Sequence, residues 1–261
     1  MTLQSKAKWL VFAAVLVLGG VGLVSYLYAD NSNSRATNTK TKPHAAKTKA
    51  NKPPKPSTST SKKAAPMPPQ PISLTDPAHA NELAPDNFTV VFETTAGTIN
   101  IDVHRDWAPV GVDRFYNLIN AGFYNDVAFF RVLTGFVAQF GLHGDPKINN
   151  VWRSARIEDD PVKHSNTRGT LSFATAGPGT RTTQIFINFG NNARLDDMGF
   201  SAFAEVQAES MPVLDKLYAG YGEGAPQGQG PSQARIQSEG NSYLKSQFPK
   251  LDFIKTASIK K

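Results

Sequence analysis

Cysteine is absent from the 261-residue sequence. Its absence excludes a disulfide framework, a thiolate nucleophile and every zinc site that depends on sulfur ligands. Three catalytic motifs are missing as well, since the chain has no GxxxxGK, HExxH or GxSxG segment. The five histidines never stand four residues apart, the spacing that places two of them on one helix face. We therefore expect no metal site, and nucleotide-dependent or serine-hydrolase chemistry has little support.

Acidic residues are scarce at the start of the chain. Residues 1–85 contain 11 Lys and Arg but 3 Asp and Glu, a net charge of +8, whereas residues 86–261 contain 17 and 18, a net charge of −1. The overall charge of +7 thus belongs to the N-terminal third. Such a total does not indicate nucleic-acid binding by a folded domain, and we expect no nucleic-acid partner.

A hydrophobic segment near the N-terminus, Trp9 to Tyr28, has 20 residues and no charge. As a helix it would span about 30 Å, the thickness of the hydrocarbon core of a bilayer. We therefore predict that residues 1–30 form a single-pass transmembrane anchor. A cleaved signal peptide is the alternative, but the apolar run is long for one, and Leu27 and Ala29 make a poor cleavage site.

Two rules disagree about the orientation of this anchor. Residues 31–70 carry nine Lys and Arg and no acid, which favours a cytoplasmic location for whatever follows the helix. A lysine-flanked hydrophobic segment at the N-terminus is the usual export signal, however, and long domains translocate largely regardless of charge. We expect a domain anchored to a bacterial inner membrane and exposed to the periplasm or another extracytoplasmic space.

Residues 31–85 have the composition of a disordered linker. Eight prolines stand between residues 43 and 71, among Thr, Ser, Asn, Lys and Ala. Such a segment cannot bury enough apolar surface to offset the entropy lost on ordering it. A solvated tether is the favoured interpretation, and weak adhesion to anionic lipid or cell-wall polymer is the alternative.

The remaining region, residues 86–261, is predicted to be a folded and mainly β domain. Short apolar runs typical of strands recur at 88–95, 98–104, 127–133, 136–140, 170–175, 184–189, 201–206 and 251–259. Many short strands with few helices indicate a barrel or a sandwich.

Two helices are predicted in this domain. Apolar residues recur at helical spacing over 109–120, and Ser210 is expected to cap a second helix that runs to Leu217. The glycine-rich stretch 220–230 follows that helix. Because it lacks the strand–turn–helix setting of a dinucleotide site, it is interpreted as a surface loop.

Two segments contain the candidate chemistry: FFRVLTGFVAQFG at 129–141 and GTLSFATAGPGTRTTQIFIN at 169–188. Taken singly, their residues have ordinary interpretations. Arg131 would be a surface charge, Phe136 a core residue and Gln139 a solvent-facing strand residue.

Together the two segments resemble the signatures of the cyclophilin family of peptidyl-prolyl isomerases. The first signature, F-x-R-x-x-x-G-F-x-x-Q, is matched by Phe129, Arg131, Gly135, Phe136 and Gln139. The second, G-x-L-S-x-A-x-A-G-P-x-T-x-x-x-Q-F-F-I, is matched by Gly169, Leu171, Ser172, Ala174, Ala176, Gly177, Pro178, Thr180, Gln184, Phe186 and Ile187. The similarity extends from about residue 88 to residue 259.

The resemblance implies a closed eight-stranded antiparallel barrel with a helix over each end. The substrate groove would lie on the outer face of the barrel, and the substrate would be an Xaa-Pro bond in another protein. No cofactor is needed.

The resemblance also implies roles for individual residues. Arg131 is the expected catalytic cation, because an always-charged guanidinium can donate a hydrogen bond to the pyramidal nitrogen of a twisted imide. Phe136 and Gln139 would act beside it. The remaining substrate-binding residues are expected to be Val137, Ala174, Thr175, Gln184, Phe186, Leu195 and Phe200.

The chain departs from the family pattern at several positions. Arg194 stands where many members carry Trp, which puts tight binding of the inhibitor cyclosporin in doubt. The stretch 195–203 has no groove histidine, and Phe200 is expected to cover that face. Thr175 replaces Asn at a position expected to act through its main chain.

The leading hypothesis is therefore a membrane-anchored isomerase of Xaa-Pro bonds that assists protein folding. A tethered module that binds Pro-containing segments without turnover is the alternative, and an adhesion protein acting through residues 31–70 is a third. Nothing in the sequence indicates an oligomer, and we expect a monomer.

Overall fold

Nine strands form one sheet within residues 73–260, the part of the chain that the computed structural model describes. The strands are β1 (Asn87–Thr94), β2 (Thr98–His104), β3 (Val127–Ala128), β4 (Arg131–Leu133), β5 (Val137–Phe140), β6 (Thr170–Phe173), β7 (Ile185–Asn188), β8 (Ala202–Val206) and β9 (Phe253–Ile259). Their order is β3-β9-β1-β2-β8-β6-β7-β5-β4, and every neighbouring pair is antiparallel. The predicted mainly β class is confirmed.

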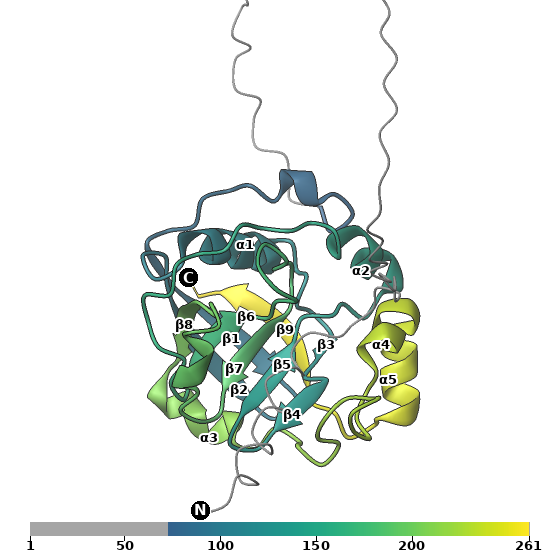
Figure 1. Ribbon diagram of the computed structural model, residues 1–261. Coiled ribbons are helices and arrows are strands. Elements are labelled where there is room, and N and C mark those ends of the chain that lie inside the picture. The colour runs from purple at the N-terminus through teal and green to yellow at the C-terminus, as the bar shows by residue number, and fades with distance from the viewer. Residues whose placement is uncertain (1–72, 261) are drawn as a thin grey trace, which may run out of the picture. The chain divides into compact units, whose positions relative to one another are not determined.

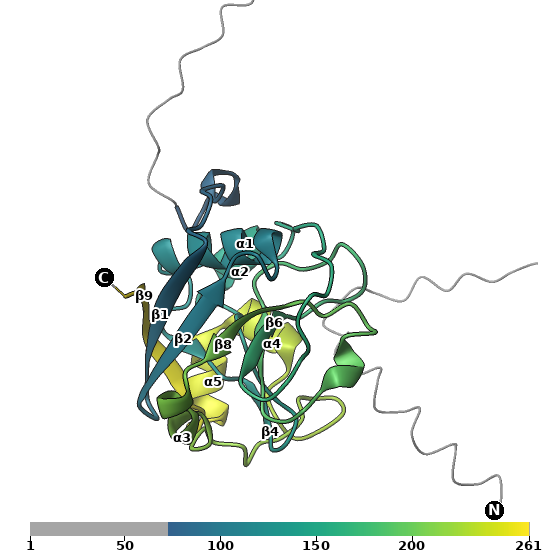
Figure 2. The same ribbon diagram turned by 90° about the vertical axis from the view of Figure 1, so that its left-hand side faces the viewer.

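The expected closed barrel of eight strands is corrected to a curled, half-barrel sheet of nine. The run 127–133, expected as one strand, is divided, because β3 pairs with β9 whereas β4 pairs with β5. Only Phe129 and Phe130 separate these two edge strands in the sequence. The sheet is curled, as the two views show (Figures 1 and 2), and this short connection joins its two edges, although β3 and β4 do not pair with each other.

Five α-helices accompany the sheet in the described residues. They are α1 (Pro109–Asn120), α2 (Pro146–Trp152), α3 (Met211–Leu214), α4 (Gln233–Glu239) and α5 (Asn241–Gln247), and three 3-10 turns stand at η3 (Pro77–His79), η4 (Ala193–Leu195) and η5 (Ala208–Ser210). Helices α1 and α3 lie at opposite ends of the sheet in both views (Figures 1 and 2). The expectation of only two helices is wrong, because α2, α4 and α5 are short segments that depend on tertiary packing.

The helix predicted over 109–120 has the bounds expected from its apolar spacing. Val112, Phe115, Leu118 and Ile119 are buried in the main core, where the Phe115 ring lies 5.1 Å from that of Phe203. Full burial of such side chains contributes about 1.5–3 kcal/mol each. This packing holds α1 across one end of the curled sheet.

The second predicted helix is shorter than expected and is not capped as expected. Helix α3 ends at Leu214, and the Ser210 side chain makes no capping hydrogen bond. The Ser210 hydroxyl instead accepts a hydrogen bond of 2.9 Å from the main-chain N–H of Asn100 in β2. The serine therefore joins this turn to the sheet.

The end of the predicted linker is part of the folded domain. The main-chain N–H groups of Glu82 and Ala84 donate to the side chains of Asn117 and Asp113 on α1, at 3.1 and 2.9 Å. The Trp152 indole donates to the carbonyl of Leu74 at 2.7 Å. Assignment of 73–85 to a disordered linker is therefore wrong, because these residues find partners on α1 and α2.

The predicted anchor, residues 1–30, and most of the predicted linker lie outside the described residues. Within 73–260, no helix has the length and apolar character needed to cross a bilayer.

Helices α4 and α5 form a second apolar cluster outside the main core. Their buried residues Ile236, Tyr243 and Leu244 pack with Phe130 and Phe248. Phe130 belongs to the two-residue connection between β3 and β4, so this helical pair packs directly beside the first residue of β4.

Gly141, the residue after β5, permits a close backbone approach to the segment before β7. Its φ is +100°, and a Cβ here would lie less than 3.0 Å from the carbonyl oxygen of Thr183. The Thr183 hydroxyl donates to the Gly141 carbonyl at 2.9 Å. This contact brings residues 139 and 184 within reach of each other.

We predict that Gly141→Ala lowers the free energy of unfolding by about 2–4 kcal/mol. Alanine is strained at this positive φ, and its Cβ would also clash with the backbone of Thr183. Gly199→Ala is the matched control, since Gly199 has a φ of +82° but open space around it. The control is expected to lose about 1 kcal/mol. Urea denaturation of both variants checks the prediction, and equal losses would contradict it.

Candidate active site

Arg131 and Gln139 face each other across the β4–β5 hairpin. They are direct partners in the antiparallel register, which places their side chains on the same side of the sheet. The Arg131 Nη1 donates to the Gln139 Oε1 at 3.3 Å, and both residues are buried, at 3% and 2% exposure. The structure therefore places these two residues of the first signature in contact.

Gln184 extends this polar row. The Gln139 Nε2 donates to the Gln184 Oε1 at 2.9 Å. The three side chains thus form a hydrogen-bonded chain from Arg131 through Gln139 to Gln184. An amide that accepts from an arginine and donates to a second amide has a defined orientation.

An apolar cluster lies beside this row and is separate from the main core. It contains six side chains, which we call the outer cluster: Phe136, Val137, Ala174, Phe186, Leu195 and Phe200. All six were predicted from the sequence as catalytic or substrate-binding residues, and the structure brings them together. Their roles remain predictions.

The outer cluster explains why β5 and β7 are buried on both faces. In β2 buried residues alternate with partly exposed ones, as expected for a sheet with one covered face. In β5 and β7 every residue is buried, because Val137 and Phe186 belong to the outer cluster whereas Ala138 and Ile187 belong to the main core.

Phe136 has a guanidinium near its ring from each of two arginines. The Cζ of Arg131 lies 5.7 Å from the ring centroid and that of Arg194 lies 4.8 Å from it. Both distances suit cation–π attraction. Arg194, noted in the sequence only as a departure from the family pattern, is therefore a neighbour of the site.

The loop after β6 uses the Thr175 side chain internally. The Thr175 hydroxyl bonds to the carbonyl of Gly177 and lies 2.8 Å from the Thr180 hydroxyl, while the N–H of Gly177 donates back to it at 3.0 Å. The Thr175 side chain is thus engaged within its own loop, and its expected role through the main chain stays a prediction.

Asp196 holds the segment that carries Leu195 and Phe200. Its carboxylate accepts from the hydroxyl of Ser165 and from the main-chain and side-chain N–H groups of Asn166, and Asn166 in turn donates to the carbonyl of Phe200 at 2.8 Å. Desolvation acts to raise the pKa of Asp196, but these hydrogen bonds outweigh it and lower that pKa.

Glu223 is a residue of the site that the sequence interpretation missed. Its carboxylate accepts from Nε and Nη2 of Arg131, both at 2.7 Å. Glu223 belongs to the glycine-rich stretch 220–230, which was interpreted only as a surface loop. No local signal identifies it, because 92 residues separate the two partners.

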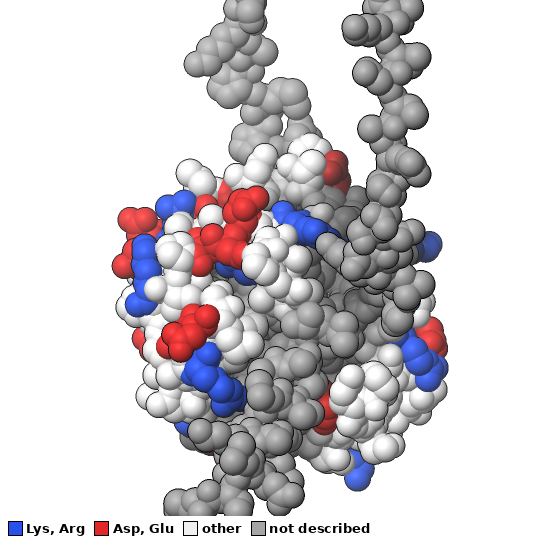
Figure 3. All heavy atoms as spheres, in the orientation of Figure 1, with Lys and Arg blue, Asp and Glu red and all other residues white. Residues whose placement is uncertain are grey.

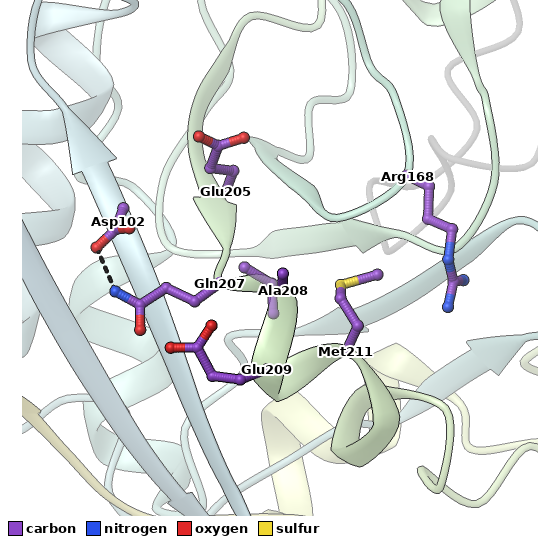
Figure 4. Close-up of a pocket in the computed structure, with 8 residues that line it drawn as sticks. Asp102, Arg168, Glu205, Gln207, Ala208, Glu209 and Met211 are labelled. Carbon is purple, nitrogen blue, oxygen red and sulfur yellow. Dashed lines mark hydrogen bonds between the residues drawn. The ribbon is translucent and has the colours of Figure 1, made fainter.

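A surface cavity elsewhere in the domain contains none of the predicted site residues. Its volume is about 610 Å³, and it is lined by Asp102, Arg168, Glu205, Val206, Gln207, Ala208, Glu209 and Met211 (Figure 4). The Asp102 carboxylate already accepts from the Gln207 amide at 2.8 Å. The cavity is therefore not part of the candidate active site.

Metal-binding groups give no second candidate in the described residues. Acidic and basic side chains are interspersed on the face shown in Figure 3. Within residues 73–260, no group of three or more His, Asp or Glu side chains is placed to hold a metal ion.

Residues 89–239 match the family model described as "Cyclophilin type peptidyl-prolyl cis-trans isomerase/CLD". The chain belongs to the cyclophilin-type peptidyl-prolyl cis–trans isomerase family. The resemblance noted in the two signatures is thereby confirmed, and the chain is an enzyme of the isomerase class.

The matched region of this chain aligns with most of the length of each similar protein. The chain is 36% identical over 140 residues to peptidyl-prolyl cis-trans isomerase A of Dickeya dadantii, spanning 49% of this chain and 70% of that protein. It is 35% identical over 142 residues to peptidyl-prolyl cis-trans isomerase B of Escherichia coli, spanning 49% and 82%. A solved cyclophilin-type isomerase from Cryptosporidium parvum aligns at 19% identity with a TM-score of 0.49, over 67% of this chain and 98% of that one.

We predict that Asp196→Asn weakens the hydrogen bonds that hold residues 195–200 and lowers the free energy of unfolding modestly, by at most about 1 kcal/mol, because the carboxylate is only partly buried. The folded-state pKa of Asp196 lies below its ordinary value of 3.8. Its contribution is therefore complete above that pH and is lost as the pH falls through the lower, folded-state pKa.

Urea denaturation of the parent and the variant between pH 7 and pH 3 checks this prediction. The difference between them should be constant at neutral pH and should shrink below about pH 4. A difference that grows toward acid pH would contradict it.

Proposed function

We propose that this cyclophilin-family enzyme isomerises Xaa-Pro bonds of protein substrates with Arg131 as its catalytic residue. The observation that carries the proposal is the placement of the Arg131 guanidinium, which is hydrogen-bonded to Gln139 and lies 5.7 Å from the Phe136 ring. A cation is thus held at the border of an apolar cluster. A proline ring and its imide nitrogen need these two environments side by side.

The chemistry requires stabilisation of a twisted imide. Rotation about a peptide bond is opposed by about 18–20 kcal/mol, because the nitrogen lone pair conjugates with the carbonyl. In the twisted state the proline nitrogen becomes pyramidal and recovers that lone pair. A guanidinium that donates to it stabilises this state over both planar isomers, which is the requirement for catalysis.

The outer cluster supplies an apolar binding surface for the proline ring. Phe186 and Phe200 pack edge to face with centroids 5.6 Å apart, and Val137 and Leu195 complete the apolar surface. Holding the ring still makes rotation of the preceding carbonyl the productive motion. Main-chain groups at Ala174 and Thr175 would bind the residue before proline.

A second candidate is a module that binds Pro-containing segments without turnover. The observation that favours it is the state of Arg131, which is 3% exposed and bonded to both Glu223 and Gln139. Binding of a planar proline needs the outer cluster more than it needs a free cation. Measured exchange rates separate the two candidates.

We predict that Arg131→Ala lowers kcat/KM by about 10²-fold or more, the loss typical of removing one preorganised donor to a transition state. Exchange NMR on a short Xaa-Pro peptide measures this. Arg194→Ala is the matched control, because Arg194 also lies over the Phe136 ring, and it should change the rate by less than about tenfold.

Two results would contradict the catalytic role. The first is a parent protein that binds the peptide but leaves its exchange rate unchanged, which would establish the binding module. The second is an equal loss of kcat/KM in Arg131→Ala and Arg194→Ala. Arg131→Ala/Glu223→Gln serves as the folding control, since it leaves no unpaired carboxylate.

The sequence further supports a membrane location for this activity. We propose that residues 9–28 anchor the chain in a bacterial inner membrane and that the isomerase domain lies on the outer side. Prolyl isomerisation takes tens of seconds without a catalyst and can limit folding. Exported chains folding at that surface would be the substrates, and the enzyme would act as a monomer.

We predict that protease added to spheroplasts degrades the domain, whereas protease added to the outside of inverted membrane vesicles has no access to it. The physical reason is that a long domain after an N-terminal export signal is translocated. Immunodetection of the domain after each treatment makes the measurement. Protection in spheroplasts combined with degradation in inverted vesicles would place the domain in the cytoplasm instead.

A further inference from the structure

The glycine-rich stretch 220–230 connects α3 to α4 and delivers one carboxylate to the candidate active site. We call it the Glu223 loop. Glu223 binds Arg131 in a two-pronged geometry, with Oε1 on Nε and Oε2 on Nη2, each at 2.7 Å. Such parallel bonds define the plane of a guanidinium as well as its position.

These bonds leave part of the guanidinium for other partners. A guanidinium has five N–H donors, and Glu223 and Gln139 occupy three of them. Both carboxylate bonds lie on the edge formed by Nε and Nη2, while Gln139 accepts from Nη1. The two partners therefore hold the group on two sides and leave a hydrogen on each terminal nitrogen.

The Glu223 loop is folded around the glutamate rather than extended into solvent. The N–H of Gly224 donates to the Glu223 carboxylate at 2.9 Å, and the N–H of Gly230 donates to its carbonyl at 2.8 Å. A Cβ on Gly228 would lie less than 3.0 Å from that same carbonyl. The glycine content thus allows the chain to close tightly behind Glu223.

The N-terminal side of the Glu223 loop is attached to the rest of the domain. Before it, the N–H of Tyr218 donates to the Asp252 carboxylate at 2.7 Å. Tyr221 packs edge to face on Phe248, with centroids 5.0 Å apart, within the apolar cluster that also contains Phe130. The loop is therefore held against the apolar cluster that contains Phe130, the residue directly before Arg131.

From this geometry we infer that Glu223 is a positioning residue, which orients the guanidinium of Arg131 for the isomerisation reaction. The inference rests on the proposed function of Arg131. A free arginine side chain samples many rotamers, and the productive one must be selected at each turnover. Glu223 selects that rotamer in advance. Its negative charge also offsets part of the positive charge of the guanidinium.

Glu223→Gln tests this inference, because the amide cannot accept both bonds. We expect kcat to fall about 10- to 100-fold while KM changes little, since the outer cluster still binds the proline ring. Glu239→Gln is the matched control. It removes another glutamate from a two-pronged pair, with Arg235 on the exposed face of α4, and should leave kcat unchanged.

A double-mutant cycle shows whether Glu223 acts through Arg131. In the Arg131→Ala background, Glu223→Gln should cause no further loss of kcat, because there is no guanidinium to orient. An equal loss in both backgrounds would overturn the inference. So would unchanged or increased activity of Glu223→Gln alone, which would mean that the carboxylate is idle or blocks the cation.

A readout without substrate keeps this inference separate from the proposed function. In the parent protein the Arg131 Nε–H should give an NMR signal protected from hydrogen exchange, and Glu223→Gln should remove the protection. Unchanged protection would overturn the inference even if the parent is an active isomerase. If Glu223→Gln does not fold, Glu223→Asp shortens the side chain by one carbon and should show the same changes in smaller measure.

Discussion

A buried arginine is the constraint on which the active-site region of this domain depends. The side chain of Arg131 is 4% exposed, and an unpaired charge in such a place is strongly destabilising. One of its partners, Gln139, is eight residues away on the neighbouring strand, and the other, Glu223, is 92 residues away on the loop between α3 and α4. Satisfying this one cation therefore ties the β4–β5 hairpin to the C-terminal third of the domain.

Strands β5 and β7 contribute to two apolar clusters, the main core on one face and the outer cluster on the other. The inward residues of β5 and β7, Ala138 and Ile187, pack in the main core. The outward residues Val137 and Phe186 build the outer cluster, with Phe200 added by the segment that Asp196 holds in place. Rigid strands thus carry the apolar surface, and a hydrogen-bonded loop completes it. This arrangement suits a site that must grip a ring while an adjacent bond turns.

Much of the candidate site was predictable from the sequence because its parts are close together along the chain. Arg131 and Gln139 are eight residues apart in a hairpin, so a register alone brings them into contact. The helix 109–120 was predicted with its observed bounds, since its apolar spacing matches its burial. The division of 127–133 was not predictable, because its two halves differ in partner and not in composition.

The sequence by itself determined the mainly β class, the α1 helix, the two signatures and the apolar residues of the outer cluster. Periodicity and motif spacing are local properties, so they can be recognised directly in the amino-acid sequence. Only the tertiary structure decided that residues 73–85 pack on α1 and α2, that Ser210 bonds to β2, and that Glu223 meets Arg131. Each is a polar contact between segments far apart in the chain. Its formation depends on where the folded backbone places a donor and an acceptor, which no local pattern records.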